Sequence, residues 1–402
     1  MRLLQDLKAK ARRLKTGWYL LRKGNAQLCL PYMSCRLFPV RSDEEHLSAT
    51  MQWLCLSQDV CGKRGSINAY TLRDGWGVPY PETSGYILAT FLAYAKYSGD
   101  ASYIQRATQI GDWEIDIQAP TGGVLSSAQV DFTRVFNTGQ VILGWCALFE
   151  QTQDQKYLEA ALRAGAYLAG IQEPDGSWQK DTHCGARTYH ARVDWALLKL
   201  ASLSGNQRFT EVALNNLKWV VAQQRENGWF ANCGFFDEAP ITHVIAYTLR
   251  GLLECHLMLG PSSELCLLPR VIQAAKALCS ALSEQPILGI QGMLPASFDD
   301  RWRSADAYSC LTGNAQSACL LFRLAGVSGT DYYRKAAEQA VHATKQTQNI
   351  DTVLALVRGA IAGSYPIFGQ YVSNGFPNWA GKFFADALLM KILYSKQATV
   401  SA

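Results

Sequence analysis

The chain has 402 residues, of which 49% are hydrophobic and 18% are charged, and this composition indicates a globular protein with a large core. The formal net charge of +5 is small for this length and no basic stripe crosses the body, so we expect no nucleic-acid partner. The 12 cysteines lack the spacing of a metal site, which predicts free, buried thiols in a reducing, cytoplasmic compartment. No motif demands a metal and we expect no cofactor; a calcium ion bound by carbonyl and carboxylate groups of the loops is left open.

The first residues of the chain form a basic segment with leucines at roughly helical spacing. Eight Lys and Arg residues stand against one acid, Asp6. A basic amphipathic helix can lie on an anionic surface, so one interpretation of residues 1–24 is peripheral contact with the inner membrane. The interpretation that we slightly favour is an exposed arm that docks on the protein's own body. We therefore expect residues 1–40 to be an N-terminal arm and residues 41–402 to be a single domain.

From residue 41 onward the chain repeats one pattern six times. A charged amphipathic helix is followed by a long irregular loop, an almost uncharged helix and a short turn, with no strand-like alternation between them. The amphipathic helices are expected to begin near Glu44, Ala101, Asp154, Asn206, Glu264 and Thr330. The uncharged helices are expected to begin near Glu82, Asn137, His190, His243, Gly313 and Trp379.

The two helix types predict an outer and an inner ring. Residues 157–169 have one apolar stripe and one polar face, so they belong outside, whereas residues 83–95 are apolar all round and must be buried. Gly85, Ala89 and Ala93 recur every four residues and allow helices to approach closely. Six inner and six outer helices make an all-α (α/α)6 toroid. Its long loops all precede inner helices, so they share the face of the inner-helix N-termini, and such loops usually carry function.

The first of these loops is the richest in ligand-type side chains. Its glycines and prolines predict a rigid, aromatic turn that ends at the positive end of a helix. We predict that Glu82 is catalytic, with capping of its own helix as the alternative. The predicted substrate contacts in this loop are Arg73, Asp74, Trp76, Tyr80 and Tyr86.

Two further carboxylates lie near the starts of inner helices. Asp131 and Asp194 are about one repeat apart, and at these positions each can also cap a helix. Glycoside hydrolysis needs two carboxyl groups that flank the bond, so Glu82, Asp131 and Asp194 are the catalytic candidates for that pair. The sequence leaves open which of them converge.

Histidines also mark the loop face. His190 and His243 lie at the starts of the third and fourth inner helices, and histidine is easily tuned for proton transfer near neutral pH. With Tyr189 they are predicted to be catalytic, and a His–Tyr pair satisfied within the core is the alternative. A lyase or epimerase acting on a uronate needs a cation or an amide at the sugar carboxylate. Further predicted substrate contacts are therefore Asn137, Arg187 and Arg192.

Aromatic rings and cations gather toward the same face. Sugars present apolar faces to such rings, and sugar hydroxyl groups need polar partners between them. Each ring alone is better explained by packing in the core than by sugar binding, so the bias toward one face carries the prediction. The remaining predicted substrate contacts are Arg134, Trp195, Trp229, Trp302, Asn314, Trp379 and Lys382.

One short motif recurs after outer helices. Residues 172–178 read Gln-Glu-Pro-Asp-Gly-Ser-Trp, with weaker copies at 118–122 and 224–229. The motif resembles the Gln/Trp repeat of terpenoid cyclases and prenyltransferase toroids, where it ties the outer helix to the next loop. The resemblance implies a scaffold role for its Gln, Gly and Trp. The Asp-x-Asp-Asp motif of class II cyclases is absent from the sequence, which argues against cyclase chemistry.

The general layout resembles six-hairpin glycosidases, polysaccharide lyases and sugar epimerases. Residues 80–86 and 376–383 are similar to bacterial exopolysaccharide-biosynthesis proteins, and 193–198 resembles a helix start that carries a catalytic aspartate in hydrolases of unsaturated uronides. The resemblance implies a carbohydrate-active enzyme that acts on an exopolysaccharide, expected to be acidic, or on its precursor, by hydrolysis or β-elimination. The alternatives are an epimerase, a non-catalytic glycan-binding or assembly factor, and a terpenoid-handling toroid. The oligomeric state is left open.

Overall fold

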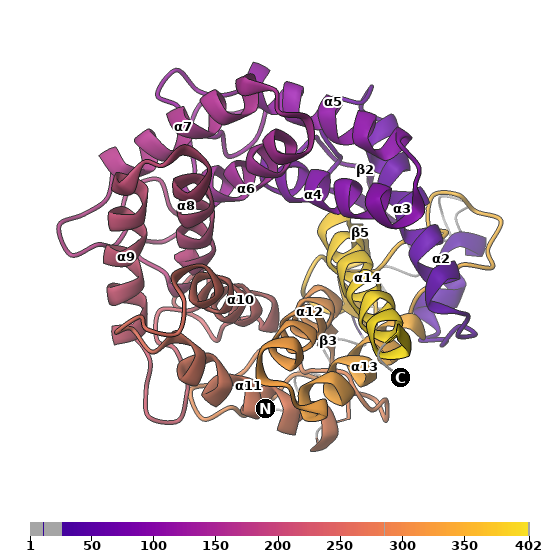
Figure 1. The fold of residues 1–402 in the computed structure, drawn as a ribbon. Coiled ribbons are helices and arrows are strands. Elements are labelled where there is room, and N and C mark those ends of the chain that lie inside the picture. Colours follow the sequence, from indigo (N-terminus) through magenta and orange to yellow (C-terminus); the bar gives the residue numbers. More distant parts are fainter. Residues whose placement is uncertain (1–10, 12–25, 285, 401–402) are drawn as a thin grey trace.

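The computed structural model describes residue 11, residues 26–284 and residues 286–400 (Figure 1). The basic segment 1–24, for which membrane contact is one of two interpretations, lies almost entirely outside the described residues. In the described part of the chain, no helix is both long enough and apolar enough to cross a bilayer. The predicted division into an arm and one domain stays a prediction.

The described helices form two concentric rings (Figure 1). The inner ring consists of α4 (Pro81–Ser98), α6 (Val135–Thr152), α8 (Ala191–Ser204), α10 (Thr242–Leu259), α12 (Leu311–Ser328) and α14 (Asn378–Val400). The outer ring consists of α3 (Asp43–Asp59), α5 (Ser102–Asp116), α7 (Gln155–Gly170), α9 (Gln207–Ala222), α11 (Leu267–Glu284) and α13 (Asp331–Lys345). Inner helices pack in chain order, and α14 packs against α4 to close the ring. The all-α (α/α)6 toroid is confirmed, and each helix begins within three residues of its predicted start.

The two rings differ in burial, as the hydrophobic patterns predicted. On the inner helix α6, every residue from Val135 to Ile142 is buried. The outer helix α7 instead buries a single stripe that contains Tyr157, Ala160 and Ala164. The uncharged helices have no polar face to expose, so they form the inner ring.

Glycines allow the inner helices α4 and α6 to touch. A Cβ atom on Gly85 would lie 2.7 Å from Cγ2 of Val141. A Cβ atom on Gly144 would lie 2.4 Å from the carbonyl oxygen of Gly85. Both distances are shorter than carbon contacts allow, so the close approach predicted at Gly85 requires glycine on both helices.

Glutamines at the ends of outer helices tie neighbouring repeats together. The Gln172 side-chain amide donates to the carbonyl oxygen of Gly176 in its own loop and to that of Val212 in the next outer helix, both at 2.9 Å. Gln118 and Gln224 make the equivalent pairs of bonds. The motif that resembles the Gln/Trp repeat thus holds each outer helix to the loop before it.

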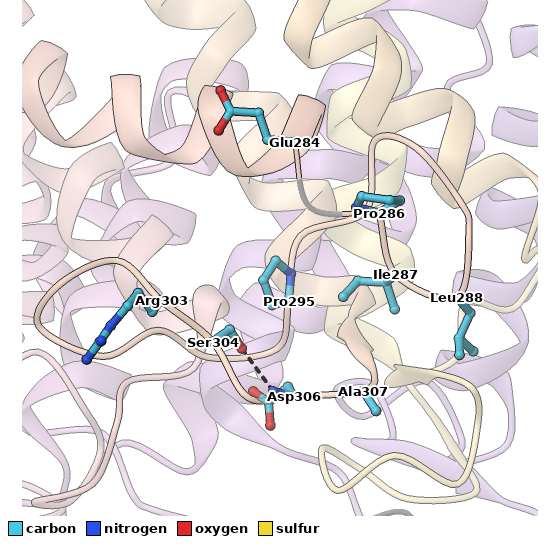
Figure 2. A pocket seen from close by; sticks show the side chains of 9 residues that line it. All are labelled: Glu284, Pro286, Ile287, Leu288, Pro295, Arg303, Ser304, Asp306 and Ala307. Atoms are coloured by element: carbon cyan, nitrogen blue, oxygen red, sulfur yellow. Dashed lines mark hydrogen bonds between the residues drawn. The ribbon is translucent and has the colours of Figure 1, made fainter. Parts of the chain in front are cut away.

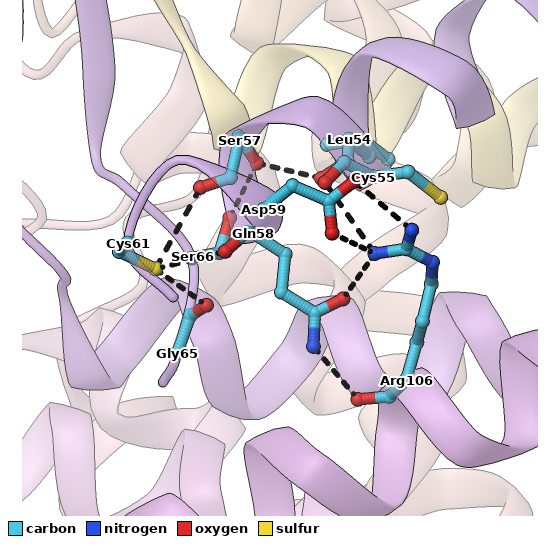
Figure 3. A network of polar contacts seen from close by, with 9 residues as sticks. All are labelled: Leu54, Cys55, Ser57, Gln58, Asp59, Cys61, Gly65, Ser66 and Arg106. Atoms are coloured by element: carbon cyan, nitrogen blue, oxygen red, sulfur yellow. Dashed lines mark hydrogen bonds and ion pairs between the residues drawn. The ribbon is translucent and has the colours of Figure 1, made fainter. Parts of the chain in front are cut away.

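In the first repeat, hydrogen bonds of Gln58 make an equivalent connection between the outer helices α3 and α5 (Figure 3). Gln58 at the end of α3 donates to the carbonyl oxygen of Arg106 at 3.0 Å. The Arg106 guanidinium donates in return to Gln58 Oε1 at 3.0 Å and to Asp59 Oδ1 at 2.8 Å. The hydroxyl groups of Ser57 and Ser66 lie 2.6 Å apart. These bonds fix the start of the loop that leads to α4.

Short strands join the loops on one face of the ring. β1 (Ala69–Thr71) pairs with β2 (Gly75–Trp76) and with β5 (Gly375–Pro377), both antiparallel. β3 (Ser309–Cys310) pairs with β4 (Ser364–Tyr365). The first and last long loops therefore form one sheet, which fixes the position of the first loop relative to the start of α14.

Helix α2 (Ala26–Met33) belongs to the predicted arm. The Tyr32 ring packs edge-on against Phe376, with centroids 5.1 Å apart. The Phe38 amide donates to the carbonyl oxygen of Gln346 at 2.8 Å. This part of the arm docks on the body of the protein.

Candidate active site

A cavity of about 340 Å³ opens at the face where the inner helices begin. Sequence analysis named five of its lining residues, which are Tyr80, Glu82, Tyr86, His243 and Trp379. The other lining residues are Asn68, Thr83, His183, Phe235, Phe236 and Tyr371. The walls combine the first loop, the starts of α4, α10 and α14, and the long loops before α8, α10 and α14.

Glu82 supplies a carboxyl group to this cavity. It is the second residue of α4, after Pro81. The Tyr80 hydroxyl donates a hydrogen bond of 3.2 Å to Glu82 Oε2. Glu82 is half-buried, and desolvation by the surrounding protein raises the pKa of its carboxyl group to about 7, against smaller opposing effects of Tyr80 and Arg192. A carboxyl group with this pKa can exchange a proton near neutral pH.

His243 is the second proton-transfer group in the cavity wall. Nε2 of Gln316 lies 2.7 Å from Nδ1 of His243. With the amide nitrogen as the donor, Nδ1 accepts and the imidazole proton lies on Nε2; with the amide turned, Nδ1–H would donate to Oε1 instead. We adopt the first assignment. Burial, together with the nearby charge of Arg192, lowers the pKa of His243 to about 3. At physiological pH His243 is therefore a neutral N–H donor.

Aromatic rings form much of the remaining wall. Nε1 of Trp379 donates to the Tyr371 hydroxyl at 2.7 Å. The rings of Phe235 and His183 lie 5.5 Å apart. Burial and the charge of Arg134 lower the pKa of His183 to about 4, so this histidine is also neutral near pH 7. Such a wall suits the apolar face of a sugar ring.

Arg192 lies inside the ring, next to the cavity but not in its wall. Its side chain is buried, and Nε donates to Gln140 Oε1 at 2.8 Å. The guanidinium carbon lies 5.0 Å from the centroid of the Tyr247 ring, which in turn lies 4.4 Å from the His243 ring. The positive charge of Arg192 lowers the pKa of Glu82, against the larger effect of burial.

The structure places the other predicted catalytic residues away from this cavity. Asp131 lies on an exposed loop. Asp194 on α8 is fully buried, and neither of its carboxylate oxygens has a hydrogen-bond partner among the described residues. The 3-10 turn η1 (Thr188–His190) carries Tyr189 and His190, whose rings pack 4.8 Å apart in the core. Their catalytic roles stay predictions, and their side chains do not line the cavity.

Most of the other predicted substrate contacts also lie outside the cavity. Asn314 of α12 connects the loop before α12 to the outer helix α13. It accepts a hydrogen bond from the Leu294 amide at 3.0 Å and donates one to the carbonyl oxygen of Ala340 at 3.0 Å. Three of the others form ion pairs: Arg73 with Asp74, Arg187 with Asp237, and Lys382 with Asp386. Two donate hydrogen bonds to backbone carbonyl oxygens: Arg134 to Thr182 and Asn137 to Leu125. The remaining contacts are between rings: Trp76 with Trp53, and Trp229 with Trp302. Trp195 and Lys382 line a smaller niche inside the ring together with Arg192.

Some residues at the site carry no sequence signal. Gln316 and Tyr247 lie within uncharged helices, and their spacing does not reveal which neighbour they face. Asn68 also lines the cavity. Its Oδ1 accepts hydrogen bonds from the amides of Ala69 at 2.7 Å and Val78 at 3.2 Å, and these bonds shape the first loop. An asparagine between a strand and a glycine-rich turn is the signal that could have indicated this role.

Two further properties concern metals and thiols. Among the described residues, no group of three or more His, Cys, Asp or Glu side chains is arranged to hold a metal ion. The cysteines whose side chains are described are free thiols. Cys266 is exposed, so the prediction of buried thiols is wrong at this position.

A larger cavity, of about 610 Å³, lies beside the connection between α11 and α12 (Figure 2). It is lined by a single stretch of chain that includes Leu288, Arg303 and Asp306, and its described lining residues include no histidine. The Asp306 carboxylate accepts a bond of 2.6 Å from the Ser297 hydroxyl, so it is engaged within its own loop. We therefore assign the candidate active site to the smaller cavity, where several inner helices converge.

No protein-family model matches the sequence, and no curated protein matches it. Solved structures of the same fold do match. An unsaturated glucuronyl hydrolase from Bacillus sp. GL1 gives a TM-score of 0.68 at 15% identity, covering 87% of this chain and 96% of the hydrolase. A polysaccharide lyase gives 0.64 at 13%, covering 89% of this chain and 99% of the lyase. Cellobiose 2-epimerase from Bacillus thermoamylovorans B4167 gives 0.63 at 11%, covering 81% and 92%. The predicted six-hairpin toroid fold is thereby confirmed.

Proposed function

We propose that the protein is a carbohydrate-active enzyme in which Glu82 transfers a proton to or from a sugar bound in the cavity at the inner-helix N-termini. The observation that carries this proposal is a half-buried carboxyl group in the cavity wall, with a pKa raised to about 7, in a wall that also contains the neutral imidazole of His243. The likeness in fold to a glucuronyl hydrolase, a polysaccharide lyase and an epimerase supports a glycan substrate.

β-Elimination fits this wall better than hydrolysis by two carboxylates. Glu82 is the one carboxyl group among the described lining residues, whereas two-carboxylate hydrolysis needs a pair. In our mechanism, ionised Glu82 takes the C–H proton next to the sugar carboxylate, a carbon–carbon double bond forms and the glycosidic C–O bond breaks. Glu82 then returns the proton to the leaving oxygen, while Nε2–H of His243 stabilises the negative charge that develops.

This mechanism requires an acidic sugar, because a carboxylate is what makes the neighbouring C–H proton removable. No Lys or Arg is among the described residues that line the cavity. Arg134, whose charge lowers the pKa of His183 in the wall, is our candidate for the group that meets the sugar carboxylate.

Epimerisation is the second candidate reaction. It needs two proton-transfer groups at one carbon, and Glu82 and His243 both line the same cavity. Hydrolysis requires that a second carboxylate enter the site with the substrate or through a loop movement, so it ranks third.

We further propose that the glycan is a bacterial exopolysaccharide or its precursor. This setting rests on the sequence resemblance at residues 80–86, which include Tyr80 and Glu82 of the cavity. Deletion of the gene from its host should change the amount or the chain length of the secreted polysaccharide, and an unchanged polymer would contradict this setting.

Product analysis distinguishes the three reactions. The purified protein is incubated with acidic oligosaccharides in D₂O. Elimination gives the ultraviolet absorbance of a new double bond, hydrolysis gives reducing ends without that absorbance, and epimerisation gives deuterium incorporation without cleavage. Binding of an oligosaccharide without any of these products would overturn the proposed enzyme and favour a non-catalytic glycan-binding factor.

A further inference from the structure

A niche of about 40 Å³ lies between four inner helices, next to the candidate active site. Three cations from three helices line it, namely Arg192 of α8, Arg250 of α10 and Lys382 of α14. Asp386, also of α14, is the one acid in its lining. The niche therefore carries an excess of positive charge in a buried position.

Two of the three cations already have carboxylate partners. Lys382 forms an ion pair with Asp386. Nε of Arg250 lies 2.7 Å from Glu254 Oε1, and Arg323 shares the same carboxylate at 2.9 Å. Glu254 is thus divided between two guanidinium groups, which leaves the charge of Arg250 only partly compensated.

Arg192 has no carboxylate within ion-pair distance among the described residues. Its exposed fraction is 4%, and its one hydrogen bond to a described residue is that from Nε to Gln140. The guanidinium carbon lies 5.3 Å from the Trp195 ring and 5.0 Å from the Tyr247 ring, so aromatic faces supply part of its solvation. A buried charge without a counter-charge is costly, and the terminal amino groups of Arg192 remain available to an acceptor.

We propose that this niche binds a small inorganic anion of about the size of chloride, held by Arg192, Arg250 and Lys382. The volume of about 40 Å³ exceeds the roughly 10–15 Å³ that a single bound water requires in a cavity, so a monatomic anion fits. The anion completes the neutralisation of Arg192 that no described side chain provides. The ion pair between Lys382 and Asp386 keeps the acid in the lining from repelling it.

The niche and the active-site cavity share a wall. Gln316 lines the niche, and its side-chain amide holds Nδ1 of His243 in the cavity. Tyr247 contacts both Arg192 and His243. The anion therefore binds directly behind the residues that position the proposed catalytic groups.

Bromide is the probe that locates the site directly. Crystals of the full chain are soaked in sodium bromide, and anomalous scattering is measured for the wild type, for Arg192→Gln and for Arg303→Gln. Arg303 is the matched control because it is a surface arginine, paired with Asp299, that lies outside the niche. We expect a bromide peak among Arg192, Arg250 and Lys382 in the wild type and the control, and none in Arg192→Gln.

Thermal unfolding gives an independent readout. At constant ionic strength, chloride in place of gluconate should raise the unfolding midpoint of the wild type and of Arg303→Gln by about 2–4 °C. It should leave Arg192→Gln unchanged, and Lys382→Met provides the same comparison if Arg192→Gln does not fold. A wild type with no bromide peak in the niche, or with no difference between chloride and gluconate, would overturn the proposal.

Discussion

Nε2 of Gln316 on α12 lies 2.7 Å from Nδ1 of His243 on α10, so a side chain of one inner helix orients the imidazole of a cavity residue on another. Gln316→Met would keep the side-chain volume but remove the donor. We expect kcat to fall about tenfold because the imidazole loses its fixed orientation, while KM changes little. Gln339→Met on the outer helix α13 is the control, because Gln339 is exposed.

The ¹⁵N chemical shifts of His243 check the physical cause. In the wild type they should show the proton on Nε2, and in Gln316→Met they should show a mixture of tautomers. A variant with wild-type kcat and an unchanged tautomer would contradict a positioning role for Gln316.

The pKa of Glu82, raised to about 7 by burial, predicts the pH dependence of the reaction. If ionised Glu82 is the base, kcat/KM for an acidic oligosaccharide should rise with pH through about 7. Arg192 lowers this pKa, so Arg192→Gln, compared in chloride-free buffer, should move the rising limb to higher pH. If Arg192→Gln leaves the pH at which kcat/KM rises unchanged, or if kcat/KM of the wild type falls as the pH rises through 7, the assignment of Glu82 as the base is contradicted.

The buried carboxyl group of Glu114 should make the protein less stable as the pH rises. It is fully buried on α5, and neither of its carboxyl oxygens has a hydrogen-bond partner among the described residues. Burial raises its pKa well above the usual range, so the folded state keeps a proton that the unfolded state releases above pH ~4.3. Stability therefore falls as pH rises from that value toward the folded pKa.

Glu114→Gln should remove this effect, because the amide does not ionise. Urea unfolding should show the variant to be about 1–3 kcal/mol more stable than the wild type at pH 8 and nearly equal to it at pH 4. Glu159→Gln on the exposed face of α7 should show no such difference. An equal gain at both pH values would indicate a cause other than ionisation.

Substitution of Gly176 tests how strongly the stability of the repeats depends on the geometry of their loops. Its φ is +87°, and a Cβ atom there would lie 2.4 Å from the carbonyl oxygen of Asn215 in the next outer helix. Gly176→Ala should cost about 2–4 kcal/mol of unfolding free energy, through backbone strain and the clash. Gly170→Ala, where nothing lies within 4 Å, should be neutral or slightly stabilising. Equal effects of the two changes would contradict this account of the repeat.

The fold could be predicted from sequence because its signal is repeated and local. The contrast between a helix such as 157–169, with one polar face, and one such as 83–95, with none, already separates outer from inner positions. The glutamine ties could be predicted as well, since Gln172 belongs to a recurring motif. Strand β5 escaped prediction because its pairing with β1 joins the last and first long loops, which are far apart in the chain.

The site was harder to predict, because it depends on the direction in which each side chain leaves its helix. Glu82 and His243 each occupy the second position of an inner helix, and both line the cavity. Asp194 is also near a helix start, but two residues further along α8 the side chain turns into the core. Gln316 lies beyond the first turn of α12, where hydrophobic patterns contain no information about its contact with His243.

Glu82→Gln tests the central claim most directly. With an acidic oligosaccharide that the wild type converts, we predict that this variant loses at least about 10²-fold in kcat while it still folds and binds the substrate. Asp131→Asn, measured beside it, should retain most of the activity, because this exposed side chain does not line the cavity. Wild-type turnover by Glu82→Gln, or loss of turnover in Asp131→Asn instead, would contradict the account.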